Sequence, residues 1–230
     1  MADFLHQTYN IFSSFATYPF QLLPHCFPPT FKHFAVQIIP YGFLGSICYI
    51  LDVIFLAIQH RILRALVDNM AHGVIAFVSW CVVSEVLTRK DLADGVLSAF
   101  IACALDVDHF IAARSFNLQN ALHLKNRPFL HSTTIVFILV PILQVWIAQN
   151  VSSLRSLPYV FAVSVISHHL RDGHRRGLWF WPFGSTPPLP YWVYITCTLV
   201  TPYFVKEIKR SIAKFNVISI SRPTGTLMDV

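Results

Sequence analysis

Ten residues, 167 to 176, combine three histidines, one aspartate and three arginines directly after the apolar run 157–166. If the apolar run forms a helix that continues into this block, His168 and Asp172 lie four positions apart on one helix face. His169 and Asp172, three positions apart, form the alternative pair. Imidazole and carboxylate groups are common ligands of divalent metal ions, so either pair predicts metal binding. The competing interpretation is a basic, solvated loop at a membrane edge.

A second group of ionisable residues follows the apolar run 92–105, where Asp106, Asp108 and His109 stand close together. Asp106 and His109 are three positions apart and share a face if the helix continues. Such residues at the end of a membrane helix are costly unless they face water, a partner or a cation. This group is therefore a second candidate for metal ligands.

The composition is that of a membrane protein. Of the 230 residues, 55% are hydrophobic and only 12% are charged, whereas soluble domains average about 25% charged residues. The mean hydropathy is +0.56, and the apolar residues occur in long runs. Only helices and closed barrels satisfy the backbone in lipid. We therefore predict an all-α membrane protein, a polytopic helical bundle of five or six transmembrane helices.

The apolar runs divide the chain into three parts. We expect residues 1–33 to form an N-terminal lead-in, residues 34–205 the transmembrane bundle, and residues 206–230 a basic tail that contacts lipid headgroups. The candidate spans are residues 34–58, 70–87, 92–105, 131–149, 159–170 and 189–205. Residues 59–69 form a polar connector. Asp52 lies inside the first span and is expected either as a hydrogen-bond acceptor between helices or as a site residue.

The net charge of +6 favours anionic lipid headgroups over nucleic acid as the partner of a membrane protein. Neither a helix-turn-helix pattern nor zinc-finger spacing occurs. The five cysteines stand apart without a CxxC pair, so neither a disulfide framework nor a thiolate zinc site is supported. We expect contact with membrane lipid and none with nucleic acid, while the sequence indicates no particular protein partner.

Threading these spans through a bilayer brings the polar groups to one side of the membrane. The second span begins near His72, the third returns with residues 106–109, the fourth leaves with His131, and the fifth returns with His168 and Asp172. The opposite side receives only short turns between these spans. We therefore predict that six metal ligands converge at one end of the bundle: His72, Asp106, His109, His131, His168 and Asp172.

The order of these groups, H…DxDH…RxxxHS…HxxxD followed by Trp-Pro-Phe, resembles the membrane-bound, metal-dependent hydrolases typified by bacterial YdjM, whose expression is tied to LexA. The resemblance covers about residues 70 to 184. The positions that match the family motifs are His72, Asp106, Asp108, His109, Arg127, His131, Ser132, His168, Asp172 and the Trp181-Pro182-Phe183 end. The resemblance implies a helical membrane architecture with its site at these residues.

One motif departs from the family pattern. The family's HRGxTHS reads NRPFLHS here, so Asn126 replaces a histidine, Pro128 a glycine and Leu130 a threonine. His123 is the nearby candidate to substitute for the lost histidine. The threonine that usually follows the last aspartate is also missing, and His174 lies nearby.

The first functional hypothesis is a metal-dependent hydrolase that acts on a lipid or phosphoester, with Zn²⁺ or Mn²⁺ as the ion according to the ligand types. Asp108, Arg127 and His131 are the candidate catalytic residues. A spare aspartate or histidine would act as general base, and arginine would hold a substrate phosphate, because guanidinium matches its geometry. Further candidates for the phosphate are Arg171, Arg175 and Arg176.

The second hypothesis is a non-catalytic membrane scaffold or binding protein. The polar groups would then form a structural metal site, or a hydrogen-bonded network that fixes the helix ends. The departures from the family motif favour this hypothesis. A transporter is a third, weaker option, because its ionisable residues are expected near the bilayer midplane rather than at one end of the bundle.

Overall fold

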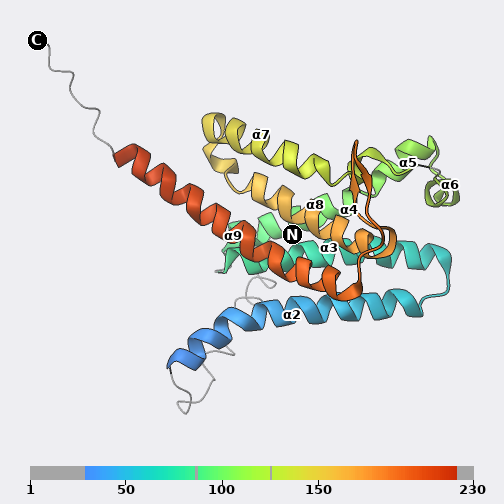
Figure 1. The fold of residues 1–230 in the computed structure, drawn as a ribbon, viewed down its shortest axis with the longest axis horizontal. Helices are drawn as coiled ribbons and strands as arrows, with labels where there is room; N and C mark the ends of the chain where they lie inside the picture. The colour runs from blue at the N-terminus through green and yellow to red at the C-terminus, as the bar shows by residue number, and fades with distance from the viewer. Residues whose placement is uncertain (1–28, 86–87, 125, 222–230) are drawn as a thin grey trace, which may run out of the picture.

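The computed structural model describes residues 29–85, 88–124 and 126–221 (Figure 1). Within these residues the fold is a helical bundle with one two-stranded antiparallel sheet. This confirms the predicted all-α membrane class. Most of the expected N-terminal lead-in, residues 1–28, and the last part of the tail lie outside the described residues.

The helices and strands are numbered as in Figure 1. They are α2 (Pro29–Ala57), α3 (Arg61–Ser84), α4 (Arg89–Ala104), α5 (Val107–Ala113), α6 (Leu118–Leu122), the 3₁₀ turn η1 (Phe129–His131), α7 (Thr134–Asn150), the 3₁₀ turn η2 (Ser152–Leu154), α8 (Leu157–Arg176), β1 (Trp179–Phe180), β2 (Gly184–Ser185) and α9 (Tyr191–Ser221). The predicted connector at 59–69 is wrong for most of its length, because α3 begins at Arg61. The expected tail also starts inside α9, which continues through residue 206 without a break.

Three helical segments in the described part of the chain are long and apolar enough to cross a membrane: Gln37–Ala57, Arg61–Ser84 and Arg89–Ala113. The apolar stretch Thr134–Ile147 of α7 is shorter. Large apolar side chains on α2 point outward, among them Leu56, which is 67% exposed. Such a surface suits contact with lipid tails. The total of five or six spans stays a prediction.

Helix α8 is the centre of the bundle and lies between α7 and α3 in Figure 1. It packs against α3, α4, α7 and α9 and contributes to three core clusters through Val160, Leu170 and Val165. Because protein surrounds α8, its polar residues do not face lipid. This explains how a helix carrying seven ionisable residues in its last ten positions can belong to a membrane bundle.

Small residues let α3, α4 and α8 approach one another closely. A Cβ atom added to Gly73 of α3 would lie 2.7 Å from the sulfur of Cys103 on α4. The hydroxyls of Ser98 and Ser164 form a hydrogen bond of 2.9 Å between α4 and α8. Packing and such bonds, rather than hydrophobic burial, hold helices together in lipid. This close approach brings His72, the neighbour of Gly73, against α8.

A tight turn after α8 returns the chain to the segment before α7. Gly177 ends α8 with φ +77° and ψ 165°, a backbone region that is essentially restricted to glycine. The turn leads into the β1–β2 hairpin, where the carbonyl of Trp179 accepts a hydrogen bond of 2.7 Å from the backbone N–H of Thr133. The hairpin therefore holds the chain next to His131.

We predict that Gly177→Ala destabilises the protein by more than the about 1–3 kcal/mol expected for a strained backbone alone. Its Cβ would overlap the carbonyl oxygen of Thr186. Gly184→Ala is the control, because Gly184 also has positive φ, +110°, but a Cβ there meets nothing within 4 Å. Thermal unfolding of both variants in detergent checks this, and equal shifts would contradict it.

We also predict that the two ends of α7 lie on opposite sides of the membrane. Helix α7 has 17 residues and is therefore about 25 Å long, which separates the 110–130 region from the 150–156 turn. Glycosylation acceptors introduced at these two places are expected to be modified from opposite sides. Modification of both from the same side would show that α7 does not cross.

Candidate metal centre

Four histidines and three aspartates from separate elements converge inside the bundle. Helix α3 supplies His72, the α4–α5 junction supplies residues 106–109, η1 supplies His131, and α8 supplies His168 and Asp172. Three groups have ligand atoms within 4.8 Å of one another: His72 with His168 and Asp172, Asp106 with His131 and His168, and Asp108 with His109 and His131. The structure thus brings together all six predicted metal ligands. Their roles stay predictions.

The two central histidines face each other. Nδ1 of His168 lies 2.9 Å from the carbonyl oxygen of Ala102, and Nδ1 of His131 lies 3.2 Å from a carboxylate oxygen of Asp108. Both oxygens accept, so a neutral ring keeps its proton on Nδ1 in each case. The two Nε2 atoms, 3.1 Å apart, would then present lone pairs to each other. That arrangement is unfavourable unless a proton or a cation lies there.

Two carboxylates surround this pair of nitrogens. Oδ2 of Asp172 and Oδ1 of Asp106 each lie 3.5 Å from Nε2 of His131. Oδ1 of Asp172 lies 3.5 Å from Nε2 of His72, whose ring stacks on that of His168 at 3.8 Å between centroids. We call these five residues the inner set: His72, Asp106, His131, His168 and Asp172. The donor set of three imidazoles and two carboxylates fits Zn²⁺ or Mn²⁺.

A proton is the alternative to a cation at the inner set. Burial lowers the pKa of His131, but hydrogen bonds with Asp106 and Asp108 and the charge of Asp172 outweigh that effect and raise its pKa to about 9. His131 lies in η1, outside the membrane-spanning helices. A cation and this proton would compete for Nε2, so metal binding at neutral pH is expected to release a proton.

Asp108 and His109 form the outer part of the cluster. One carboxylate oxygen of Asp108 accepts from the backbone N–H of Leu130 at 3.0 Å and orients His131. The other lies 3.1 Å from Nδ1 of His109, although neither of these two buried atoms has a hydrogen-bond partner of good geometry among the described residues. A carboxylate behind a histidine ligand fixes its ring orientation and tautomer, which gives Asp108 a positioning contact with His131.

His169 does not belong to the three groups. Its Nε2 lies 2.9 Å from the carbonyl oxygen of Leu130, one residue before His131. The ring therefore supports the η1 turn rather than facing the inner set. Of the two alternatives, His168 is the one grouped with Asp172, with Nε2 3.9 Å from Oδ2 of Asp172; its role as a metal ligand stays a prediction.

Arg171 and Arg175 of α8 form ion pairs with aspartates. Arg171, which is 2% exposed, contacts Asp52 of α2 and Asp68 of α3. Arg175 contacts Asp68 at 2.7 Å and Asp172 at 2.6 Å. The suggestion that Arg171 and Arg175 hold a substrate phosphate is therefore wrong in this structure. Asp52 contacts Arg171 across helices, which corresponds to the structural role that was one of the two roles expected for it.

Asp68 was not expected among the residues of the site. It binds Arg175, which in turn orients Asp172, so it belongs to the surroundings of the inner set. A signal was present, because Asp68 lies four positions before His72 and shares its helix face. The pairing itself joins residues more than a hundred positions apart and leaves no local pattern.

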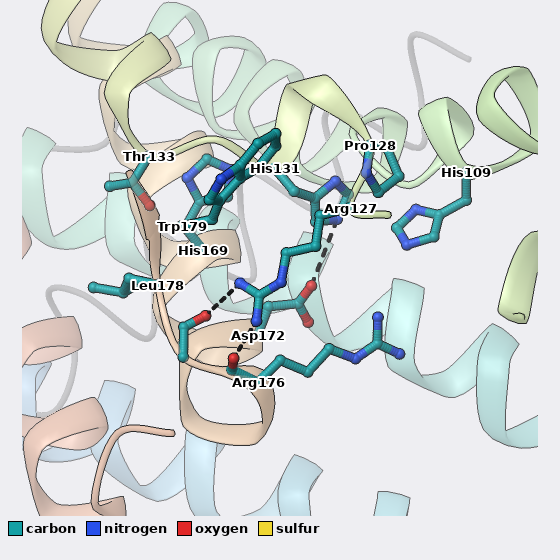
Figure 2. Close-up of a pocket in the computed structure, with 11 residues that line it drawn as sticks. His109, Arg127, Pro128, His131, Thr133, His169, Asp172, Arg176, Leu178 and Trp179 are labelled. Carbon is teal, nitrogen blue, oxygen red and sulfur yellow. Dashed lines mark hydrogen bonds and ion pairs between the residues drawn. The ribbon is translucent and has the colours of Figure 1, made fainter. Parts of the chain in front are cut away.

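Arg127 covers the end of α8. Its guanidinium donates to the carbonyl oxygens of Gly177, at 2.8 Å, and of Arg176, and Figure 2 shows both bonds at the last turn of the helix. Carbonyls at a helix C-terminus need such donors. His123, the candidate substitute for the lost family histidine, is exposed and contacts the carbonyl of Gln119 at 2.7 Å. It joins none of the three groups, so that suggestion is wrong in this structure.

Two pockets adjoin the cluster. The inner pocket, of about 20 Å³, is lined among others by His131, His169 and Asp172 (Figure 2), and it has room for about one water molecule. The outer pocket, of about 270 Å³, is more open. His109 and Arg127 line both pockets. A ligand in the outer pocket would therefore lie next to the metal-ligand cluster.

Fold and site together define an all-α membrane protein with a histidine–aspartate cluster inside its bundle. The family model described as YdjM inner membrane protein matches residues 67–223, which include every member of the cluster. The chain belongs to the YdjM family.

Curated relatives share most of the chain. The protein is 46% identical over 167 residues to "Transmembrane protein 267" of Mus musculus, covering 70% of this chain and 77% of the relative. It is 36% identical over 192 residues to the protein of the same name from Danio rerio, covering 81% and 86%. No solved structure gives a significant match. An integral membrane location follows from the family, the relatives and the apolar helices.

We predict that Arg171→Gln lowers the free energy of unfolding by about 3–5 kcal/mol, the cost of breaking a buried ion pair. The change leaves Asp52 and Asp68 without their shared partner. Arg210→Gln is the matched control, because Arg210 also pairs with two acidic residues, but at an exposed surface. Denaturant unfolding in detergent checks the difference. Equal losses would show that the α8 pairs do not hold the helices.

Proposed function

We propose that this protein is a membrane-embedded, metal-dependent hydrolase that acts on a phosphoester or ester of a lipid. The observation that carries the proposal is the meeting of the His131 and His168 Nε2 atoms, 3.1 Å apart, between two carboxylates. The inner set would hold the ion. A divalent ion bound there supplies Lewis acidity and makes a coordinated water more acidic.

In this proposal, the outer residues His109 and Asp108 would move a proton. His109 lines both pockets and has its Nδ1 3.1 Å from Asp108. A histidine beside a carboxylate is a suitable general base. Because Nδ1 faces Asp108, Nε2 is the nitrogen that would accept a proton and return it to a leaving group. Asp108 also fixes His131 and η1, which keeps the base and the inner set in one geometry. The proposal thus uses Asp108 to position His131 and His109, and the catalytic roles expected for Asp108, Arg127 and His131 stay predictions.

A structural metal site is the second candidate. His72 and His168 are 1% and 0% exposed, and Arg127 uses two of its five N–H donors on backbone carbonyls. An ion held only by the most buried ligands would tie α3 to α8 without reaching substrate. The protein would then be a scaffold or binding protein, and its metal would affect stability alone.

We predict that protein purified in detergent contains Zn²⁺ or Mn²⁺, and that His168→Ala abolishes this binding because it removes a central ligand. His169→Ala should weaken metal affinity by at most about 10–100-fold, because it changes only the support of a ligand. His123→Ala is the control and should leave metal content unchanged. Elemental analysis gives the readout. Equal metal content in all variants would remove the basis of the proposal.

Hydrolysis distinguishes the two candidate functions. The metal-loaded protein is expected to release nitrophenol from a nitrophenyl phosphate, and EDTA should stop the reaction. His109→Gln should abolish turnover while metal stays bound, because it removes the proposed base but keeps the inner set. A protein that binds metal but shows no metal-dependent turnover on monoester, diester or carboxylic ester probes would support the structural site instead.

A further inference from the structure

The outer pocket has a one-sided charge. Its polar lining consists of His109, Asn126, Arg127 and Arg176, and no carboxylate residue lines it. It lies next to the inner pocket, which also contains His109, Arg127 and Arg176. Two guanidiniums without an acidic residue beside them in the same pocket favour an anionic ligand.

Arg176 is the arginine of α8 that is free to bind such a ligand. Arg171 and Arg175 are held by aspartates, whereas the Arg176 side chain is exposed and has no hydrogen bond or ion pair within the described residues. Figure 2 shows it running below Asp172 toward the side of the pocket where His109 lies. Burial and the neighbouring Arg176 lower the pKa of Arg127, and the charge of Asp172 in the inner pocket offsets only part of this effect, so the two cations repel each other. An anion between them would relieve that repulsion.

The other wall of the outer pocket is apolar, with Leu122 and Leu124 in its lining. The surrounding elements also present apolar side chains outward: Ile111 is 71% exposed, Phe116 99% and Phe129 63%. Exposed groups of this kind around a polar pocket are suited to the membrane interface. A ligand with both an anionic head and an acyl chain would satisfy the two walls together.

We propose that the outer pocket binds a phosphate monoester through Arg127 and Arg176, and that a lipid supplies this phosphate while its acyl chains lie along Leu122 and Leu124. The two positive charges match the nearly two negative charges of a monoester at neutral pH. This inference deepens the proposed function, since it names the substrate class of the same site. A bound phosphate would lie beside His109, the proposed base.

Calorimetric titration of the full chain in detergent, with EDTA present to prevent turnover, tests the inference. The probes are dihexanoyl phosphatidic acid, glycerol 3-phosphate and dihexanoyl phosphatidylcholine. Phosphatidic acid is expected to bind most tightly, glycerol 3-phosphate more weakly, and phosphatidylcholine least. Arg176→Gln should weaken binding of the first two about tenfold, because a charge-assisted bond is lost. Arg155→Gln, an exposed arginine that lies outside both pocket linings, should change neither.

A second variant tests the lipid part. Leu122→Asn should weaken phosphatidic acid and leave glycerol 3-phosphate unchanged. Unaltered binding in Arg176→Gln would overturn the phosphate site, and equal affinity for phosphatidic acid and glycerol 3-phosphate would overturn the lipid assignment. These results are independent of the hydrolase proposal. If the purified chain holds no metal but still binds phosphate through Arg176, the hydrolase proposal is refuted and the phosphate site is retained. If the chain shows metal-dependent turnover but its phosphate binding does not depend on Arg176, the phosphate site is refuted and the hydrolase proposal is retained.

Discussion

Each charged side chain buried along α8 needs a partner of opposite charge. Helices α2 and α3 supply several of these partners, and the ion pairs form a continuous row. Arg171 binds Asp52 of α2 and Asp68 of α3, and Asp68 also binds Arg175, which in turn binds Asp172. An unpaired charge in such a place costs several kcal/mol. The positions of α2 and α3 against α8 are therefore tied to this row of ion pairs, and the row ends at a residue of the candidate metal centre.

The same row shapes the chemistry of the cluster. Arg175 takes one oxygen of Asp172 and leaves the other, 3.5 Å from His131, directed at the inner set. Backbone and carboxylate acceptors fix the Nδ1 protons of His131 and His168, so both Nε2 atoms point at one place. The helices and η1 thus direct converging lone pairs and carboxylates at one place. Preorganisation of this kind is what a catalytic or structural metal site requires.

Hydropathy and residue order predicted much of this arrangement. The polar groups stand where α4 ends and α7 begins, so counting spans was enough to place Asp106 and His131 together. The spacing of His168 and Asp172 predicted their common helix face. Residues 59–69 were predicted to be a connector because they include charged side chains, but α3 already begins at Arg61. Arginine, leucine and alanine in this stretch have high helix propensity. The pairs of Asp68 and the carbonyl contacts of Arg127 depend on tertiary geometry, which no local pattern records.

The departures from the family motif fall on positions that act in different ways. Leu130 contributes its backbone, since its N–H binds Asp108 and its carbonyl contacts His169; a leucine in place of threonine keeps both contacts. Asn126, which stands where the family pattern has histidine, lines the outer pocket and belongs to none of the three ligand groups. The substitution thus changes the lining of the outer pocket and removes no member of the inner set. Neither of these two departures removes a side chain from the three ligand groups.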